Sequence, residues 1–218
     1  MDMRSYVERM TALNLSNSIF VDCTSSEVVT DSYEDILQAN ISIVTPNKKA
    51  NSGALEKYKR LRQTALKRSV KFLYETNVGA GLPVINTLND LLLSGDKVIR
   101  IEAVLSGTMN FIYSSFVTGK RFSEVVKEAR EKGYTEPDPR DDLNGMDVAR
   151  KALILSREAG HDLELKDINV ENLVPEDCRQ EADIEKFFKL LEIHDKEFDE
   201  VRSKAEAKGE KLRYMAVL

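Results

Sequence analysis

The sequence predicts an α/β protein in which a parallel sheet is followed by a region of mixed α+β character. In the first third of the chain, three short apolar runs alternate with amphipathic stretches of helical period. Strands that are joined by single helices form parallel β-α-β units. After residue 78 a glycine-rich turn ends this alternation, and the last third is acidic and helical in pattern.

The first region contains three predicted strands, at residues 18–23, 41–45 and 70–74, with helices over about 32–40 and 52–69. Parallel sheets bind their ligands at the carboxyl ends of the strands. Each of these ends carries polar residues, namely Thr24-Ser25-Ser26, Pro46-Asn47-Lys48-Lys49 and Glu75-Thr76-Asn77. The three strand ends therefore predict a binding cleft.

The second region begins at Gly79-Ala80-Gly81, and Pro83 suits the first turn of the helix that follows. Alternation from Val98 to Leu105 predicts a strand. Helices are expected at about 108–117, 123–132 and 145–159. Leu212–Leu218 resembles a strand that is cut off as it begins, so we expect the chain to be a fragment.

Composition excludes several classes of protein. At 218 residues the chain can form one large or two small domains, and 42% hydrophobic with 32% charged residues is typical of a globular protein. No apolar run approaches the ~20 residues of a membrane span, and no secretory signal begins the chain. Two cysteines exclude a disulfide scaffold, and a net charge of -5 argues against a general nucleic-acid binder. We expect a cytoplasmic protein.

The usual dinucleotide-binding signature is absent from this sequence. Such a domain begins with a strand, a Gly-x-Gly-x-x-Gly turn and a helix that binds the pyrophosphate, yet no such element precedes Ser18. The segment Gly79–Val84 has valine where a small third residue is required, and we interpret it as a tight turn into a helix. If the chain belongs to a nucleotide enzyme, it lacks the first β-α-β unit.

The segment Gly133–Lys151 is the most unusual in the chain. Two prolines restrain a loop that carries four carboxylates, at Glu136, Asp138, Asp141 and Asp142. The following helix places Asp147 and Lys151 four residues apart on one face. A lysine that is close to carboxylates and walled by apolar groups can donate or accept a proton. One alternative is that Asp147 and Lys151 form a surface ion pair, and another is that the acidic loop is a solvated cap. The spacing alone does not decide among these interpretations.

Other polar residues allow more than one interpretation. Glu75, with nearby carbonyls, could bind a hard cation or could cap the next helix. Lys48 and Lys49 could bind phosphate or carboxylate, or could be solvated. Cys23 is expected to be a small buried residue rather than a nucleophile. No role is assigned to Cys178, His161 or His194, since neither histidine lies in a metal-ligand spacing.

Five motifs together resemble homoserine dehydrogenases, most closely the dehydrogenase portion of bifunctional aspartokinase–homoserine dehydrogenases. In family order they are Val21–Ser26, Thr45–Asn51, Glu75–Ile85, Leu105–Thr108 and Gly133–Lys151. The resemblance implies a partial, Rossmann-like dinucleotide-binding domain at residues 1–78. It also implies a catalytic and dimerisation domain at residues 79–218, incomplete at its C-terminal end, with helices packed on a sheet.

The resemblance further implies an NAD- or NADP-dependent interconversion of L-aspartate 4-semialdehyde and L-homoserine, in threonine and methionine biosynthesis, by a homodimer or higher homo-oligomer. Lys151 matches the proton donor and acceptor. The matching substrate residues are Glu136, Asp147, Asp141 and Asp142, and the matching cofactor residues are Thr24, Ser25 and Lys48. A monovalent-cation site, for an ion such as Na⁺, matches Glu75 with the carbonyls of Val78, Ala80 and Leu82.

Two alternatives remain open. Without the glycine-rich turn, the chain could be a non-catalytic folding and dimerisation module of its parent enzyme, weakly active or inactive alone. A thiol-dependent semialdehyde dehydrogenase would instead use Cys23. The preference between NAD and NADP also stays open, because the residue that selects between them belongs to the absent first unit.

Overall fold

The computed structural model describes residues 2–218, and these form two compact units. Unit 1 comprises the residues up to Ile99 together with Arg150–Ile168, and unit 2 comprises Arg100–Ala149 with Asn169–Leu218. Each unit is therefore built from two separate stretches of the chain. Among the described residues, no helix is both long and apolar enough to cross a membrane.

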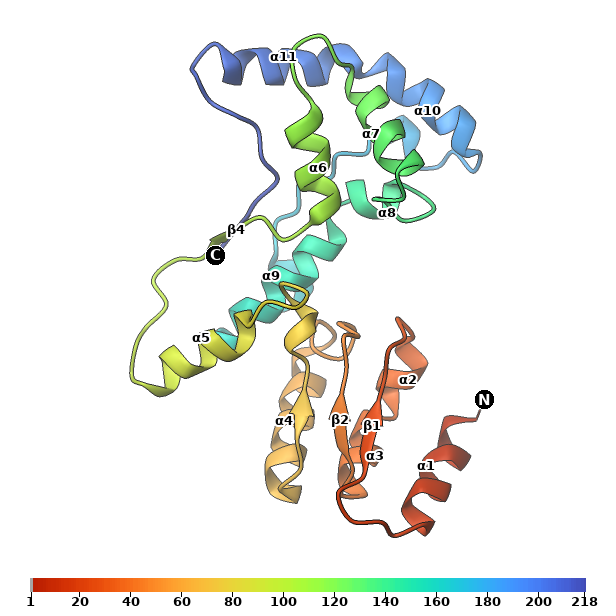
Figure 1. Cartoon of the computed structure of the whole chain (residues 1–218), viewed down its shortest axis with the longest axis vertical. Coiled ribbons are helices and arrows are strands. Elements are labelled where there is room, and N and C mark those ends of the chain that lie inside the picture. Colours follow the sequence, from red (N-terminus) through yellow and green to blue (C-terminus); the bar gives the residue numbers. More distant parts are fainter. Residues whose placement is uncertain (1) are drawn as a thin grey trace. The chain divides into compact units, whose positions relative to one another are not determined.

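Unit 1 contains a parallel three-stranded sheet in the order β1 (Ile19–Val21), β2 (Ser42–Val44), β3 (Phe72–Leu73). The helices α2 (Glu27–Asp31) and α3 (Tyr33–Gln38) connect β1 to β2, and α4 (Leu55–Arg68) connects β2 to β3 (Figure 1). The predicted strands and the parallel α/β arrangement are confirmed, although each strand is shorter than the apolar run that predicts it.

The core of unit 1 lies on one face of this sheet. Phe20 and Ile43 are opposite each other on β1 and β2, and both are buried against α3 and α4. The alternating residues Val21, Val44 and Leu73 point to the other face and are exposed. An N-terminal helix, α1 (Met3–Ala12), was not among the predicted elements; it begins at Asp2, whose side chain accepts hydrogen bonds from the backbone of residues 4 and 5.

Three further helical segments complete unit 1. They are the 3₁₀ turn η1 (Glu75–Asn77), α5 (Val84–Leu93) and η2 (Leu165–Asp167). Helix α9 (Met146–Glu158) begins in unit 2 and continues into unit 1. At its end the buried carboxylate of Glu158 accepts hydrogen bonds from Tyr58, Arg62 and Tyr74, at 3.0, 2.7 and 2.8 Å.

Unit 2 is mainly helical. It contains α6 (Gly107–Ser115), α7 (Phe122–Glu131), α8 (Arg140–Leu143), the 3₁₀ turn η3 (Glu176–Cys178), α10 (Ile184–Ile193) and α11 (Asp195–Glu206). Its core includes Met109, Ile112, Leu143 and Phe187, and Phe122 stacks on Phe198 with ring centroids 3.9 Å apart.

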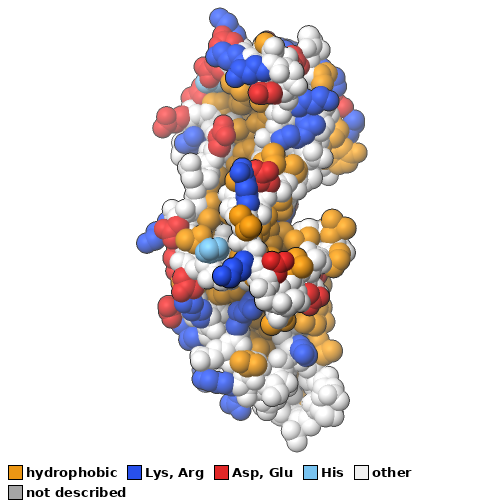
Figure 2. All heavy atoms as spheres, turned by 90° about the vertical axis from the view of Figure 1, so that its left-hand side faces the viewer, with side chains coloured by type: hydrophobic (Ala, Val, Ile, Leu, Met, Phe, Trp, Pro, Cys, Tyr) orange, Lys and Arg blue, Asp and Glu red, His pale blue; other side chains and the backbone are white. Residues whose placement is uncertain are grey.

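On the face of the molecule shown in Figure 2, Lys and Arg side chains are interspersed with Asp and Glu side chains.

The strand predicted over Val98–Leu105 is only partly formed. Strand β4 covers Glu102–Ala103 and pairs antiparallel with β5 (Ala216–Val217). The prediction of a longer strand is wrong, because Ile99 is 97% exposed and no partner segment extends the pairing to it. The C-terminal segment, predicted as a strand from residue 212, forms its strand only at β5.

Candidate functional site

A buried carboxylate joins the loops that follow β1 and β2. Asp22 is 2% exposed, and its oxygens accept hydrogen bonds from the Tyr33 hydroxyl at 2.5 Å and from the Asn47 side chain at 3.1 Å. The backbone N–H of Thr24 also donates to Asp22, at 2.7 Å. Burial alone would raise the pKa of Asp22, but hydrogen bonds from Tyr33, Thr24 and Asn47 outweigh it and lower that pKa. The carboxylate is therefore charged at neutral pH.

This network positions the residues predicted to touch the cofactor. Thr24 and Ser25 lie on the loop after β1 and are exposed, whereas Lys48 is half-buried on the loop after β2. Asn47 holds the two loops together, because its side chain donates to Asp22 and, at 3.0 Å, to the carbonyl of Ser26. The structure thus places the three residues on neighbouring loops at the carboxyl edge of the sheet.

The third strand end is joined to the second through buried asparagines. The Asn77 side chain donates to the carbonyl of Thr45 at 3.1 Å, and the Asn51 side chain donates to Asn77 at 2.9 Å. Arg157 on α9 donates to the carbonyl of Asn51 at 2.8 Å. The sequence predicted Asn77 only as one of the polar strand-end residues and Asn51 only as part of a motif, because an asparagine in a sequence does not show whether it is buried.

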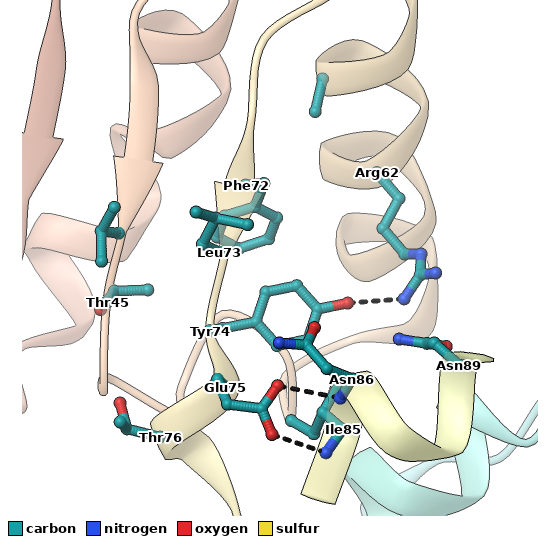
Figure 3. Close-up of a pocket in the computed structure, with 12 residues that line it drawn as sticks. Thr45, Arg62, Phe72, Leu73, Tyr74, Glu75, Thr76, Ile85, Asn86 and Asn89 are labelled. Carbon is teal, nitrogen blue, oxygen red and sulfur yellow. Dashed lines mark hydrogen bonds between the residues drawn. The ribbon is translucent and has the colours of Figure 1, made fainter. Parts of the chain in front are cut away.

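Glu75 begins η1, and its side chain reaches the first turn of α5. Its two carboxylate oxygens accept hydrogen bonds from the backbone of Ile85 and Asn86, at 2.8 and 2.9 Å (Figure 3). The turn between them requires Gly79, which has a φ of 82° and whose Cβ, if present, would lie 2.5 Å from Val84. Glu75 therefore caps the N-terminus of α5, as one of the two interpretations predicted. The cation site that Glu75 would form with the carbonyls of Val78, Ala80 and Leu82 stays a prediction.

A pocket of about 510 Å³ lies beside Glu75 and is contained in unit 1 (Figure 3). Phe72 and Leu73 contribute apolar walls, and Arg62 and Tyr74 contribute polar ones. The Arg62 guanidinium donates to the Tyr74 hydroxyl at 2.6 Å and to the carboxylate of Glu158 at 2.7 Å. Sequence patterns gave no indication of this group, since its members are up to 96 residues apart.

In unit 2, the acidic loop brings carboxylates together around Asp142. The Asp142 carboxylate accepts a hydrogen bond from the Glu136 backbone at 2.8 Å and is half-buried. Burial raises the pKa of Asp142, and the nearby negative charges of Glu136 and Asp147 raise it further, against hydrogen bonds that lower it. Such a group favours a bound cation, because a positive charge would relieve both effects.

The other two carboxylates of the loop differ from Asp142. Asp138 pairs with Arg140 at 2.6 Å, and Arg140 also donates to the carbonyl of Cys178 at 3.4 Å and to that of Glu181. This hydrogen bonding from Arg140 lowers the pKa of Asp138 and gives it a structural role. Asp141, by contrast, is exposed on α8.

Helix α9 carries Asp147 and Lys151 one turn apart, and both are half-buried. Asp147 belongs to unit 2 and Lys151 to unit 1, since the boundary follows Ala149. The apolar positions of the same helix, among them Ala152 and Leu155, are buried. Just before the helix, Gly145 has a φ of 74°, and a side chain there would collide with Tyr214.

Cys23 is exposed, so the prediction that it is a small buried residue is wrong. Asp22 occupies the inward position at the end of β1, and side chains alternate between faces along an extended chain, so its neighbour points outward. Lys49 is half-buried, and its backbone N–H donates to the Asn47 side chain at 3.1 Å. His161 is exposed.

Two family models match the chain. The model described as homoserine dehydrogenase matches residues 83–218, and the NAD-binding domain of homoserine dehydrogenase matches residues 2–75. A bifunctional aspartokinase/homoserine dehydrogenase of Haemophilus influenzae is 50% identical over 91% of this chain, which covers 24% of that relative. A chloroplastic bifunctional relative from Arabidopsis thaliana is 48% identical over 94% of this chain, which covers 22% of it. The chain thus spans about a quarter of the length of these relatives.

Solved structures agree in fold. A crystal structure of a Candida auris protein of unknown function has a TM-score of 0.93 and 38% identity, covering 100% of this chain and 62% of that one. A hyperthermophilic archaeal homoserine dehydrogenase in complex with NADPH has a TM-score of 0.60 and 30% identity, covering 69% of this chain and 48% of that one.

Proposed function

Because this chain belongs to the homoserine dehydrogenase family, we propose that it supplies catalytic residues for the NAD(P)-dependent interconversion of L-homoserine and L-aspartate 4-semialdehyde. The observation that carries the proposal is the group of carboxylates around Asp142, followed on α9 by Lys151. Acidic groups that repel one another suit an amino-acid substrate that brings an ammonium group.

The carboxylates of Glu136, Asp142 and Asp147 bind the substrate ammonium in this proposal, with Asp141 as a further acidic residue of the site. Charge-assisted hydrogen bonds to a carboxylate are shorter and stronger than neutral ones. The negative charges of Glu136 and Asp147 raise the pKa of Asp142, whereas the positive charge of a bound ammonium attracts the Asp142 carboxylate and lowers that pKa. Substrate binding therefore stabilises the ionised form of the loop.

Lys151 acts on the proton of the substrate hydroxyl. During homoserine oxidation the neutral amine accepts that proton, and in the reverse direction its ammonium returns it to the aldehyde oxygen. The nicotinamide, when bound, accepts or supplies the hydride. Thr24, Ser25 and Lys48 would hold the dinucleotide, and the donor-rich strand ends fit its polar groups.

The remaining family features are part of the same proposal. Glu75 and the carbonyls of Val78, Ala80 and Leu82 hold a monovalent cation such as Na⁺. Each carboxylate oxygen of Glu75 has a second lone pair besides the one that accepts a backbone N–H. We also propose a homodimer or higher homo-oligomer, a cytoplasmic location, and a functional division into residues 1–78 and 79–218.

The test is homoserine-dependent reduction of NAD and of NADP by the purified chain and its Lys151→Ala variant. Loss of the proton-transfer group is expected to lower kcat on the order of 10²–10⁴-fold. The matched control is Lys132→Ala, which removes an exposed lysine paired with Glu128 at 2.7 Å and should retain activity. Cys23→Ser should also retain activity, because a thiol-dependent semialdehyde dehydrogenase would need Cys23 and the proposed reaction does not.

Near-normal turnover by Lys151→Ala would refute the role of this lysine. If the wild-type chain is folded by circular dichroism and shows no turnover with either cofactor, the non-catalytic folding and dimerisation module becomes the better interpretation.

A further inference from the structure

A thiol, an imidazole and a carboxylate converge in unit 2, in residues to which the proposed reaction gives no part. Asp177 and Cys178 are consecutive on η3, and His194 lies at the junction between α10 and α11. Their possible ligand atoms all lie within 4.8 Å of one another. His194 Nε2 is 2.9 and 3.0 Å from the two oxygens of Asp177.

The surrounding structure fixes the two elements that carry these groups. Cys178 is fully buried in the core cluster of unit 2, together with Phe187 and Leu191 of α10. Its backbone N–H donates to the carbonyl of Pro175 at 3.0 Å, and its carbonyl accepts from Arg140. The His194 backbone N–H donates to Leu191 at 3.0 Å. The three side chains are thus preorganised by helix ends and core packing rather than by an open loop.

Nucleophilic chemistry does not explain the group. Cys178 is fully buried, so its thiol cannot reach a substrate as a nucleophile would. An ion pair between His194 and Asp177 accounts for those two residues only. The Cys178 side chain also hydrogen-bonds to Asp177, and the three ligand atoms together lie within 4.8 Å of one another.

We propose that Asp177, Cys178 and His194 bind one zinc-type divalent transition-metal ion, with the fourth position open to water. Thiolate sulfur, imidazole nitrogen and carboxylate oxygen are the ligands that Zn²⁺ takes in proteins. With metal–ligand distances of ~2.0–2.3 Å and tetrahedral angles, neighbouring ligand atoms lie roughly 3.3–3.8 Å apart. The three ligand atoms now lie within 4.8 Å of one another, so binding requires the side chains to rotate until these atoms are closer together.

The other ring nitrogen of His194 supports this assignment. Nδ1 lies 3.5 Å from Oε2 of Glu197, so the ring presents Nε2 to Asp177 and Nδ1 to a second carboxylate. Histidines that bind metals commonly donate their remaining N–H to a carboxylate, which fixes the ring and its tautomer. Side-chain exposures of 20% for His194 and 51% for Asp177 leave the ion a route from solvent.

Metal binding replaces the S–H bond of Cys178 with a sulfur–metal bond, and the proton leaves to solvent. The ion would connect η3 to the junction of α10 and α11. Since the unfolded chain does not bring the three ligands together, the ion binds the folded state preferentially and stabilises unit 2.

The experiment is a titration of the metal-free, reduced chain with ZnCl₂ by calorimetry, repeated with Co²⁺ by absorption spectroscopy. The chain has two cysteines and two histidines, so the thiol ligand and the imidazole ligand each have a matched control. We expect one equivalent to bind to the wild type, with a thiolate-to-cobalt charge-transfer band. Cys178→Ser and His194→Gln should each weaken binding by at least ~10-fold and remove or alter that band, while Cys23→Ser and His161→Gln should bind as the wild type does.

Absence of stoichiometric binding by the wild type would overturn the proposal. So would affinity that is unchanged in Cys178→Ser and His194→Gln, or that falls in the Cys23 or His161 controls instead. If Cys178→Ser does not fold, His194→Gln and the charge-transfer band of the wild type decide, because a site without the thiolate gives no such band.

Discussion

Asp22 in unit 1 and Asp142 in unit 2 are both withdrawn from solvent, yet their pKa values shift in opposite directions. Asp22 accepts hydrogen bonds from Tyr33, Asn47 and the backbone of Thr24, and its pKa is lowered although burial opposes this. Burial raises the pKa of Asp142, and its neighbours Glu136 and Asp147 add negative charge. The two pKa values therefore shift in opposite directions because Asp22 has more hydrogen-bond donors around it and Asp142 has negatively charged neighbours.

The difference separates a structural carboxylate from one that is suited to a ligand. The donors around Asp22 belong to the protein, so its charge is compensated before any ligand arrives. The pKa of Asp142 is raised instead, and the proposed binding of a substrate ammonium would reverse that shift. The contrast predicts that removing the charge of Asp22 lowers the stability of the fold, whereas removing the charge of Asp142 lowers the affinity for the substrate.

The largest effect on stability is expected for Asp22→Asn. The asparagine places an amide nitrogen where an oxygen accepted hydrogen bonds, and it leaves a buried donor unpaired at a cost of about 2–4 kcal/mol in unfolding free energy. Because the pKa of Asp22 is lowered from 3.8, the wild-type advantage is full above that value and disappears as pH falls through the folded-state pKa. Urea unfolding across this pH range measures both quantities.

Asp31→Asn is the matched control for Asp22→Asn. Asp31 is exposed and pairs with Lys57 at 2.5 Å, so its replacement should change the unfolding free energy by less than ~1 kcal/mol. Equal destabilisation by the two variants would contradict the structural role given to Asp22.

A smaller loss is expected for Tyr33→Phe. The substitution keeps the ring, which packs edge-on against Phe20 and Phe72, and removes only the hydroxyl that donates to Asp22. A hydrogen bond to a charged group contributes about 1.5–3 kcal/mol, and the variant should lose an amount near the lower end of that range. Tyr6→Phe, on the exposed side of α1, is the control. If the two variants unfold alike in urea, the Asp22 network contributes less than the contrast requires.

The smallest change in stability, and of opposite sign, is expected for Asp142→Asn. The pKa of Asp142 in the folded state is raised above 3.8, its value in the unfolded chain. The free energy of unfolding of the wild type therefore falls as pH rises from 3.8 through the folded-state pKa. The variant has no ionisable group at this position, so it does not lose this stability at neutral pH. Below both pKa values the variant and the wild type should be equally stable. In the same variant the KM for homoserine should rise roughly tenfold or more, because a charge-assisted hydrogen bond is lost.

Asp31→Asn again provides the control for KM, which it should leave unchanged. An Asp142→Asn variant that loses stability at neutral pH and keeps its KM would show that Asp142 is a structural acid like Asp22.

The parts of the fold that depend on local pattern could be predicted from sequence. Apolar runs and helical periods located β1, β2 and β3 and their parallel connection, and the polar strand ends were recognised as one edge. Burial at the level of single residues could not be predicted. Asp22 points inward and Cys23 outward because successive side chains of a strand point to opposite faces. A shift of one residue in the register would exchange the two positions, and polar residues at a strand end do not reveal that register.

Long-range pairs account for the rest of what the sequence did not show. Glu158 meets Arg62 across 96 positions, and Cys178 meets His194 because two helices and a turn bring them together. Neither spacing follows any helical or strand period. The motif Gly133–Lys151 was identified without such information because all its members lie within one short stretch of chain.

The interrupted course of unit 1 has a consequence for synthesis on the ribosome. Its first stretch ends at Ile99, but the carboxylate that pairs with Arg62, Tyr58 and Tyr74 is that of Glu158, which is translated some 60 residues later. Until then the nascent sheet and helices have an arginine and two buried tyrosines without their shared acceptor. Unit 1 therefore matures only after Glu158 has emerged, so its first stretch depends on protection from aggregation and proteolysis until then.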